Sequence, residues 1–102
     1  MSGYYDRQGQ PVTQEEWMRA FEDPAYQRVA LYEEGGYVVS TVWLGLDHSF
    51  GEDSPPLIFE TLVLRGYDGE ELMYRCSTED EAYEQHARVV SMLESAPLED
   101  LA

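Results

Sequence analysis

Hydrophobic and polar residues follow distinct periods along the chain, and these periods predict its elements. Residues 37–46 are β-branched or aromatic at most positions, which is typical of a β-strand. Three further strands are predicted at residues 25–32, 57–64 and 72–76, the first of them on the weakest pattern. Turn and loop residues separate the four strands at 33–36, 47–56 and 66–69.

A short helix is predicted at residues 14–22. Thr13 and Glu16 have the spacing of a capping box, in which each side chain bonds to the backbone N–H of the other. Trp17 and Phe21 are four residues apart and share one helical face. Pro24 ends the helix, because the residue before a proline avoids the helical conformation.

A longer helix is predicted to begin after Ser77 or Thr78 and to end at Ala96-Pro97. Its apolar stripe is formed by Ala82, His86, Val89 and Leu93, and widened by Tyr83, Ala87 and Val90. His86 is therefore expected to be a core residue. Acidic residues at positions 79–81 suit the first turn, where the helix dipole favours negative charge.

The order of these elements predicts an α+β fold, a four-stranded antiparallel meander with a short N-terminal helix and a longer C-terminal helix packed on it. We expect one domain over residues 1–96 and a loose acidic tail over 97–102. Neither face of the strand at 37–46 is clearly polar. Helices therefore cover both faces of the sheet, or one face meets a partner.

Charge narrows the choice of partner. The 102 residues include 21 Asp and Glu against 6 cations, all arginine, which gives a formal charge of −15. Such a surface disfavours nucleic acids and anionic membranes. No apolar run is long enough for a spanning helix, and the N-terminal residues lack a signal-peptide pattern, so a cytoplasmic location is expected. A single cysteine, Cys76, allows neither an internal disulfide nor a cysteine metal cage.

Two central segments, VSTVWLGLDHSFG at 39–51 and PPLIFETLV at 55–63, resemble a family of small uncharacterised proteins from actinobacteria and their phages. Residues in the flanks, such as Trp17 and the helix after Thr78-Glu79, share the likeness, which covers nearly the whole chain. The turn at 66–69 and the heavier acidity depart from the family pattern. The resemblance implies a bacterial host and a phage or prophage origin, but no activity, cofactor or catalytic residue.

One loop cluster resembles a catalytic or metal site. Asp47 and His48 are followed by Glu52 and Asp53, and a histidine with carboxylates could bind a divalent metal or act as acid and base. Glu60, inside a predicted strand, could belong to such a site, or it could pair with Arg75 or Arg65. A metal-binding or enzymatic module centred on Asp47, His48 and Glu60 is therefore one alternative. The structural interpretation is favoured, and we expect no enzyme, cofactor or metal.

The acidic excess supports a different hypothesis. Carboxylates gather in the predicted turns, where they either solubilise the domain or bind a basic protein surface. The favoured function is a non-catalytic interaction protein that binds a basic protein of the host or of a defence system, as an inhibitor and a mimic of nucleic acid. The candidate contact residues are Glu33, Glu34, Tyr67, Asp68, Glu70 and Glu71. A structural homodimer that buries the second sheet face is the third alternative.

Overall fold

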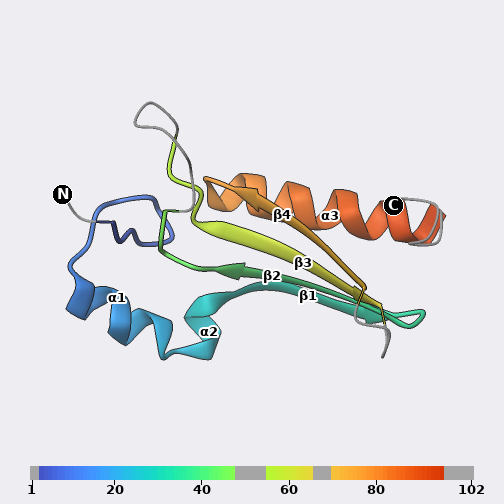
Figure 1. Ribbon diagram of the computed structural model, residues 1–102, viewed down its shortest axis with the longest axis horizontal. Coiled ribbons are helices and arrows are strands. Elements are labelled where there is room, and N and C mark those ends of the chain that lie inside the picture. The colour runs from blue at the N-terminus through green and yellow to red at the C-terminus, as the bar shows by residue number, and fades with distance from the viewer. Residues whose placement is uncertain (1–2, 48–54, 66–69, 96–102) are drawn as a thin grey trace.

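The computed structural model describes residues 3–47, 55–65 and 70–95, with only the backbone of Glu70 and Glu71 (Figure 1). The elements in chain order are α1 (Gln14–Phe21), α2 (Pro24–Gln27), β1 (Arg28–Glu34), β2 (Tyr37–Trp43), β3 (Phe59–Arg65), β4 (Glu70–Cys76) and α3 (Glu79–Ser95). The four strands form one antiparallel sheet in the order β1-β2-β3-β4. The predicted α+β meander is therefore confirmed.

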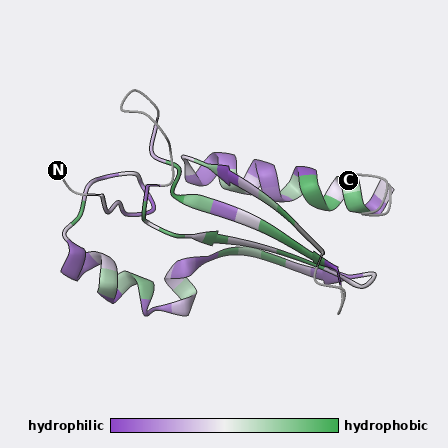
Figure 2. Cartoon of the chain, viewed as in Figure 1, coloured by the Kyte–Doolittle hydropathy of each residue, from purple (hydrophilic) through white to green (hydrophobic). Residues whose placement is uncertain are grey.

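Helix α3 lies across one face of the sheet and contacts all four strands, while α1 and α2 lie at one end of it (Figure 1). The covered face, which we call the α3 face, holds side chains that are fully buried: Val39, Thr41, Trp43, Phe59, Thr61 and Val63. From α3, three residues of the predicted stripe are buried against it: Ala82, Val89 and Leu93. The first half of the helix is hydrophilic and the second half more hydrophobic (Figure 2).

The predicted widening of that stripe is only partly correct. Val90 packs against the buried cluster around Val39 and Val63. Tyr83 is 48% exposed and Ala87 is also exposed, so these two predictions are wrong. A single helix on a sheet buries a narrow arc, and at 100° per residue these two positions turn away from it.

The opposite side of the sheet, which we call the open face, carries no described helix. Strand alternation and register place on it Val38, Ser40 and Val42 of β2, with their neighbours Leu62 and Leu64 of β3. The central row of this face runs across the strands in the order Leu31, Ser40, Leu62 and Met73, so that Leu31 of β1 and Met73 of β4 are its outer members. Leu31 is 40% exposed and Met73 49%.

Aromatic rings fill the end of the sheet where α1 and α2 lie. Trp17 stacks on Phe21 with ring centroids 4.9 Å apart, and Tyr26 meets Trp43 edge to face at 4.9 Å. The predicted capping box is present, because Thr13 Oγ1 accepts from the N–H of Glu16 and Glu16 Oε1 accepts from that of Thr13. This end of the molecule is therefore held by ring packing and by a defined helix start.

Several predicted boundaries were wrong. The strand expected at 37–46 ends at Trp43, because Gly45 has a φ of +72° and a Cβ there would lie 2.5 Å from Trp43 Cζ2. Pro24 ends α1 but also begins α2, so residues 25–27, predicted as the start of the first strand, are helical, and β1 begins at Arg28. The side chain of Asp23 caps α2 by accepting a hydrogen bond from the backbone N–H of Ala25. Proline suits the first turn of a helix because its missing N–H has no partner there anyway.

Candidate functional site

Two connections bring acidic residues to one end of the sheet. In the register, Glu34 pairs with Tyr37, Tyr37 with Arg65, and Arg65 with Glu70. The β1–β2 turn, the end of β3 at Arg65 and the start of β4 at Glu70 therefore lie at the same end of the sheet, which we call the hairpin end. Its outer strands carry Glu33 and Glu34 on one side and the backbone positions of Glu70 and Glu71 on the other, roughly 14 Å apart at three strand spacings.

An open hollow of about 570 Å³ lies at the hairpin end, between the first hairpin and the last turn of α3. Its lining residues are Tyr32, Glu34, Gly35, Tyr37, Leu93, Glu94 and Ser95. Burial raises the pKa of the Tyr32 phenol, and the nearby carboxylates of Glu94 and Glu34 raise it further. The hollow thus combines aromatic walls with a negative potential, an arrangement that suits an ammonium or guanidinium group.

Three carboxylates of this end have no partner among the described residues. Glu33, Glu34 and Glu94 are exposed and make no hydrogen bond or ion pair with any residue in the described ranges. Glu94 was missed by the sequence analysis, because only the packing of α3 across the sheet brings its last turn beside the first hairpin. No local sequence pattern signals that proximity.

Most described acids at the other end serve the fold. Glu79 pairs with Arg7, Glu15 with Arg19, and Glu81 accepts from the backbone N–H groups of Ser77 and Thr78. Asp6 accepts from Gln8 and Gln10 in the same way. Among the described acids, partners are therefore common away from the hairpin end, whereas Glu33, Glu34 and Glu94 have none.

The predicted contact residues are only partly placed. Glu33 and Glu34 lie exposed at the hairpin end, and Glu70 and Glu71 begin β4 there, with their backbone alone described. Tyr67 and Asp68 lie outside the described residues. The structure thus brings together four of the six positions and adds Glu94 to them.

Two residues of the alternative metal or catalytic centre, Asp47 and Glu60, form bonds that hold the fold. Asp47 Oδ1 accepts a hydrogen bond of 3.0 Å from the N–H of Leu57, which closes the loop between β2 and β3. Glu60 forms an ion pair of 3.4 Å with Arg75, which lies directly opposite it on β4. This is one of the two pairings that the sequence predicted for Glu60. His48, Glu52 and Asp53 lie outside the described residues. Within the described ranges, no three His, Cys, Asp or Glu residues are placed to hold a metal ion.

A polar network crosses the core between α3 and the sheet. The buried hydroxyls of Thr41 and Thr61 lie 2.8 Å apart; Thr41 also contacts His86 Nδ1 at 2.8 Å, and Gln85 donates to Thr61. Burial lowers the pKa of His86. The neutral imidazole then completes the hydrogen bonds of buried hydroxyls. His86 is half-buried against the sheet, as expected of a core residue, and this network explains a polar side chain there.

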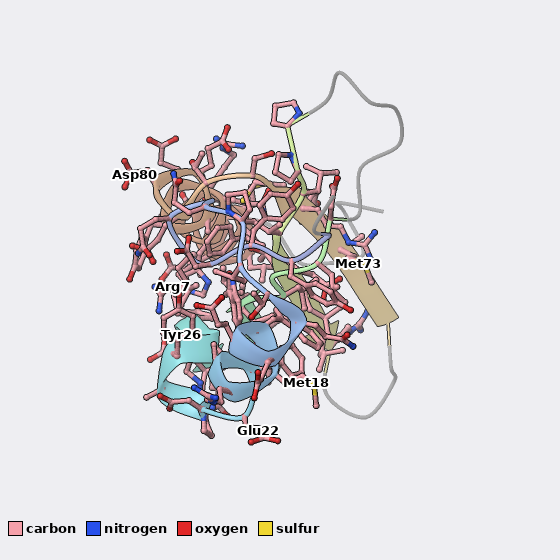
Figure 3. The ribbon with its side chains drawn as sticks, turned by 90° about the vertical axis from the view of Figure 1, so that its left-hand side faces the viewer. Arg7, Met18, Glu22, Tyr26, Met73 and Asp80 are labelled. Atoms are coloured by element: carbon pink, nitrogen blue, oxygen red, sulfur yellow. The ribbon has the colours of Figure 1, made fainter. Side chains whose placement is uncertain are left out.

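Two further groups are committed to the fold. Burial raises the pKa of the Cys76 thiol to about 11, and Glu81 adds to the shift, so the thiol is protonated near neutral pH. Arg7 donates to Glu79 and to the backbone carbonyl of Tyr26, and its guanidinium lies 5.6 Å from the centre of that ring (Figure 3). A hollow of about 450 Å³ beside Arg7 is lined by the start of α3, including Asp80, but its cation is already paired.

No known family model, curated protein or solved structure matches this chain. Among the described residues, no helix has the length and apolar character needed to cross a membrane. The geometry of the hairpin end therefore carries the functional argument.

Proposed function

We propose that this protein is a non-catalytic interaction protein that binds a basic segment of another protein through its hairpin end. The observation that carries the proposal is the gathering of Glu34 and Glu94, which have no partner among the described residues, around a hollow with tyrosine walls. An inserted arginine or lysine would gain two carboxylates and an aromatic face. The resemblance to phage proteins makes a host protein or a defence protein the expected partner.

The mechanism is electrostatic association followed by steric occlusion. A chain of charge −15 attracts a basic surface over distances of about a Debye length, roughly 8–10 Å at physiological salt. Aromatic side chains at the centre of an interface then supply most of the affinity. If the occupied surface is a nucleic-acid channel, the protein acts as a mimic and inhibitor.

The first experiment is capture from a bacterial host lysate by the immobilised chain at about 0.05 M and about 0.5 M NaCl, since surface charge pairs weaken at high salt. A Glu34→Lys/Glu94→Lys variant is expected to bind the captured protein at least about tenfold more weakly, because each reversal replaces attraction with repulsion. The control is Glu22→Lys/Glu84→Lys, which makes the same change of net charge at exposed positions away from the hollow.

Equal losses in both variants would refute a specific site and leave only general charge. A competition experiment with nucleic acid tests whether the protein is a nucleic-acid mimic or binds some other basic surface. A mimic must be displaced from its partner by duplex DNA or RNA, whereas a binder of some other basic surface is not displaced.

A further inference from the structure

The open face has the composition of a protein interface. Its central row contains the exposed Leu31 and Met73, with Ser40 and Leu62 between them. Val38 and Leu64 lie in the row on one side, and Val42 lies in the row on the other side beside the ion pair of Glu60 and Arg75. Figure 3 shows Met73 beside β4 on the side away from α3. An exposed, mainly apolar patch of this kind on a sheet usually marks a binding surface.

At the two ends of β1, this face carries charges of opposite sign that have no partner among the described residues. Glu33 is the cross-strand partner of Val38 at the hairpin end, and Arg28 is the partner of Val42 at the other end of β1. Both are exposed, and neither makes a hydrogen bond or ion pair with another described residue. A basic partner would be attracted to Glu33 but repelled by Arg28.

We propose that the open face is the interface between two copies of this chain, related by a two-fold axis that runs across the strands through the row of Ser40. This operation exchanges the ends of each strand. It lays the row of Glu33 and Val38 over the row of Arg28 and Val42 of the second copy, and the apolar central row over itself. A two-fold axis makes the contact isologous, so each Glu33–Arg28 pair occurs twice.

The other in-plane axis, along the strands, brings equivalent ends together. Glu33 would then lie over the hairpin end of its partner and face acidic residues. Like charges brought together across an interface oppose binding. The charges at the two ends of β1 therefore select one arrangement, in which the sheets pack face to face about 10 Å apart, as aligned sheets do.

The expected dimer is weak. Four strands of seven residues form a face of roughly 19 by 23 Å, so two such faces bury on the order of 900 Å² in projection. Stable interfaces of standard size bury about 1,200–2,000 Å². Each copy also has a formal charge of −15, and this repulsion is weakest when salt screens it. Association is therefore expected at micromolar or higher concentrations, and raised salt strengthens it.

The test measures mass by sedimentation equilibrium from about 1 μM to about 500 μM, across the range where a weak interface populates both states. The 11.7 kDa chain should approach twice that mass, and more readily at about 0.5 M than at about 0.05 M NaCl. Met73→Glu should abolish the increase. The matched control is Met18→Glu on α1, because Met18 is also 49% exposed but lies off the open face.

The second test exchanges charges. Glu33→Arg and Arg28→Glu, each alone, place like charges opposite one another and should associate at least about tenfold more weakly. An equimolar mixture of the two variants restores both pairs and should form a heterodimer as readily as the native chain. Glu84→Arg, on the exposed side of α3, makes the same change of charge as Glu33→Arg and should leave association at least as strong.

A chain that stays at 11.7 kDa throughout would overturn the proposal. So would equal effects of the two methionine variants, or a mixture that fails to associate. Pairing through the edge of β1 is also distinguished, because it would tolerate Met73→Glu on the opposite edge. The proposal does not depend on the proposed function, whose hollow at Glu34 and Glu94 lies on the α3 side.

Discussion

The two faces of one sheet have opposite fates in this protein, although both are rich in apolar residues. On the α3 face, Val39, Phe59 and Val63 are completely buried, and even the polar groups have partners. On the open face, Leu31 and Met73 remain exposed by almost half. The difference arises because, of the helices in the described ranges, α3 alone is long enough to span the sheet, and a helix covers one side.

The comparison teaches how to separate residues that hold the fold from residues that are available for binding. Adjacent positions on a strand point to opposite faces, so each strand contains its own matched pair. Substitutions on the α3 face should change stability, whereas those on the open face should change association. Four predictions test this division.

The largest difference is expected between two neighbours on β3. Val63→Ala removes methyl groups from a completely buried site and should cost about 2–3 kcal/mol of unfolding free energy. Leu62→Ala removes more carbon atoms but should cost about 1 kcal/mol or less, because the open face is already solvated in the monomer. Urea denaturation of both variants at low micromolar concentration measures this, and a costlier Leu62→Ala would contradict the division.

A thiol on each side of β4 probes the same division chemically. With its pKa raised from 9.0 to about 11, Cys76 should be alkylated near pH 7.5 roughly a hundredfold more slowly than a thiol of ordinary pKa. A Met73→Cys/Cys76→Ser variant moves the thiol three residues along the strand to an exposed site. Iodoacetamide kinetics should show the ordinary rate for that variant, and similar rates for both proteins would show that Cys76 is accessible.

The third prediction compares the stability cost of removing a buried hydroxyl with the cost of removing a half-buried one. Thr61→Val removes the acceptor of Gln85 and the partner of Thr41, and should cost about 1–3 kcal/mol of stability because polar groups lose their partners in the core. Ser40→Val, on the open face, should change stability by no more than about 0.5 kcal/mol. Thr61→Ser keeps the hydroxyl and should recover part of the loss, which a purely steric effect of valine would not explain.

The smallest effect is expected from titration of His86. Because burial lowers its pKa in the folded chain, the unfolded chain takes up the proton first as the pH falls below 6.5. Stability should therefore decrease on acidification through that value and level off below the lowered pKa. Unfolding measured from about pH 7.5 to 5.5, where most carboxylates stay ionised, should show the decrease, and His86→Gln should reduce it. An unchanged slope in the variant would assign the pH dependence to other groups.

The order of helices and strands followed from local sequence patterns. These patterns were accurate where a single hydrophobic period continued along the whole element. Thr13 and Glu16 marked the start of α1, and Glu81 completes the corresponding box with Thr78 at α3. Boundaries failed where a distant residue decided them. The end of β2 depends on the approach of Trp17 to Gly45, and Trp17 lies far away in the sequence.

The candidate site was only partly predictable for the same reason. Glu33 and Glu34 stand out in the sequence as two adjacent acids in a predicted turn, but Glu94 does not stand out. Its place beside Tyr32 depends on the path of α3 across all four strands. The pairing of Glu60 was narrowed to two arginines from sequence, and the register of β3 and β4 selected Arg75.

The sequence by itself determined the class of fold, the negative charge and the period of each element, because these properties depend on residues close together along the chain. The tertiary structure alone decided which face of the sheet α3 covers, which acids remain unpaired, and which ends of the strands meet. Those outcomes depend on residues far apart in sequence coming together, as Thr41 does with His86, and as Glu34 and Glu94 do around one hollow. No local pattern encodes contacts of that kind.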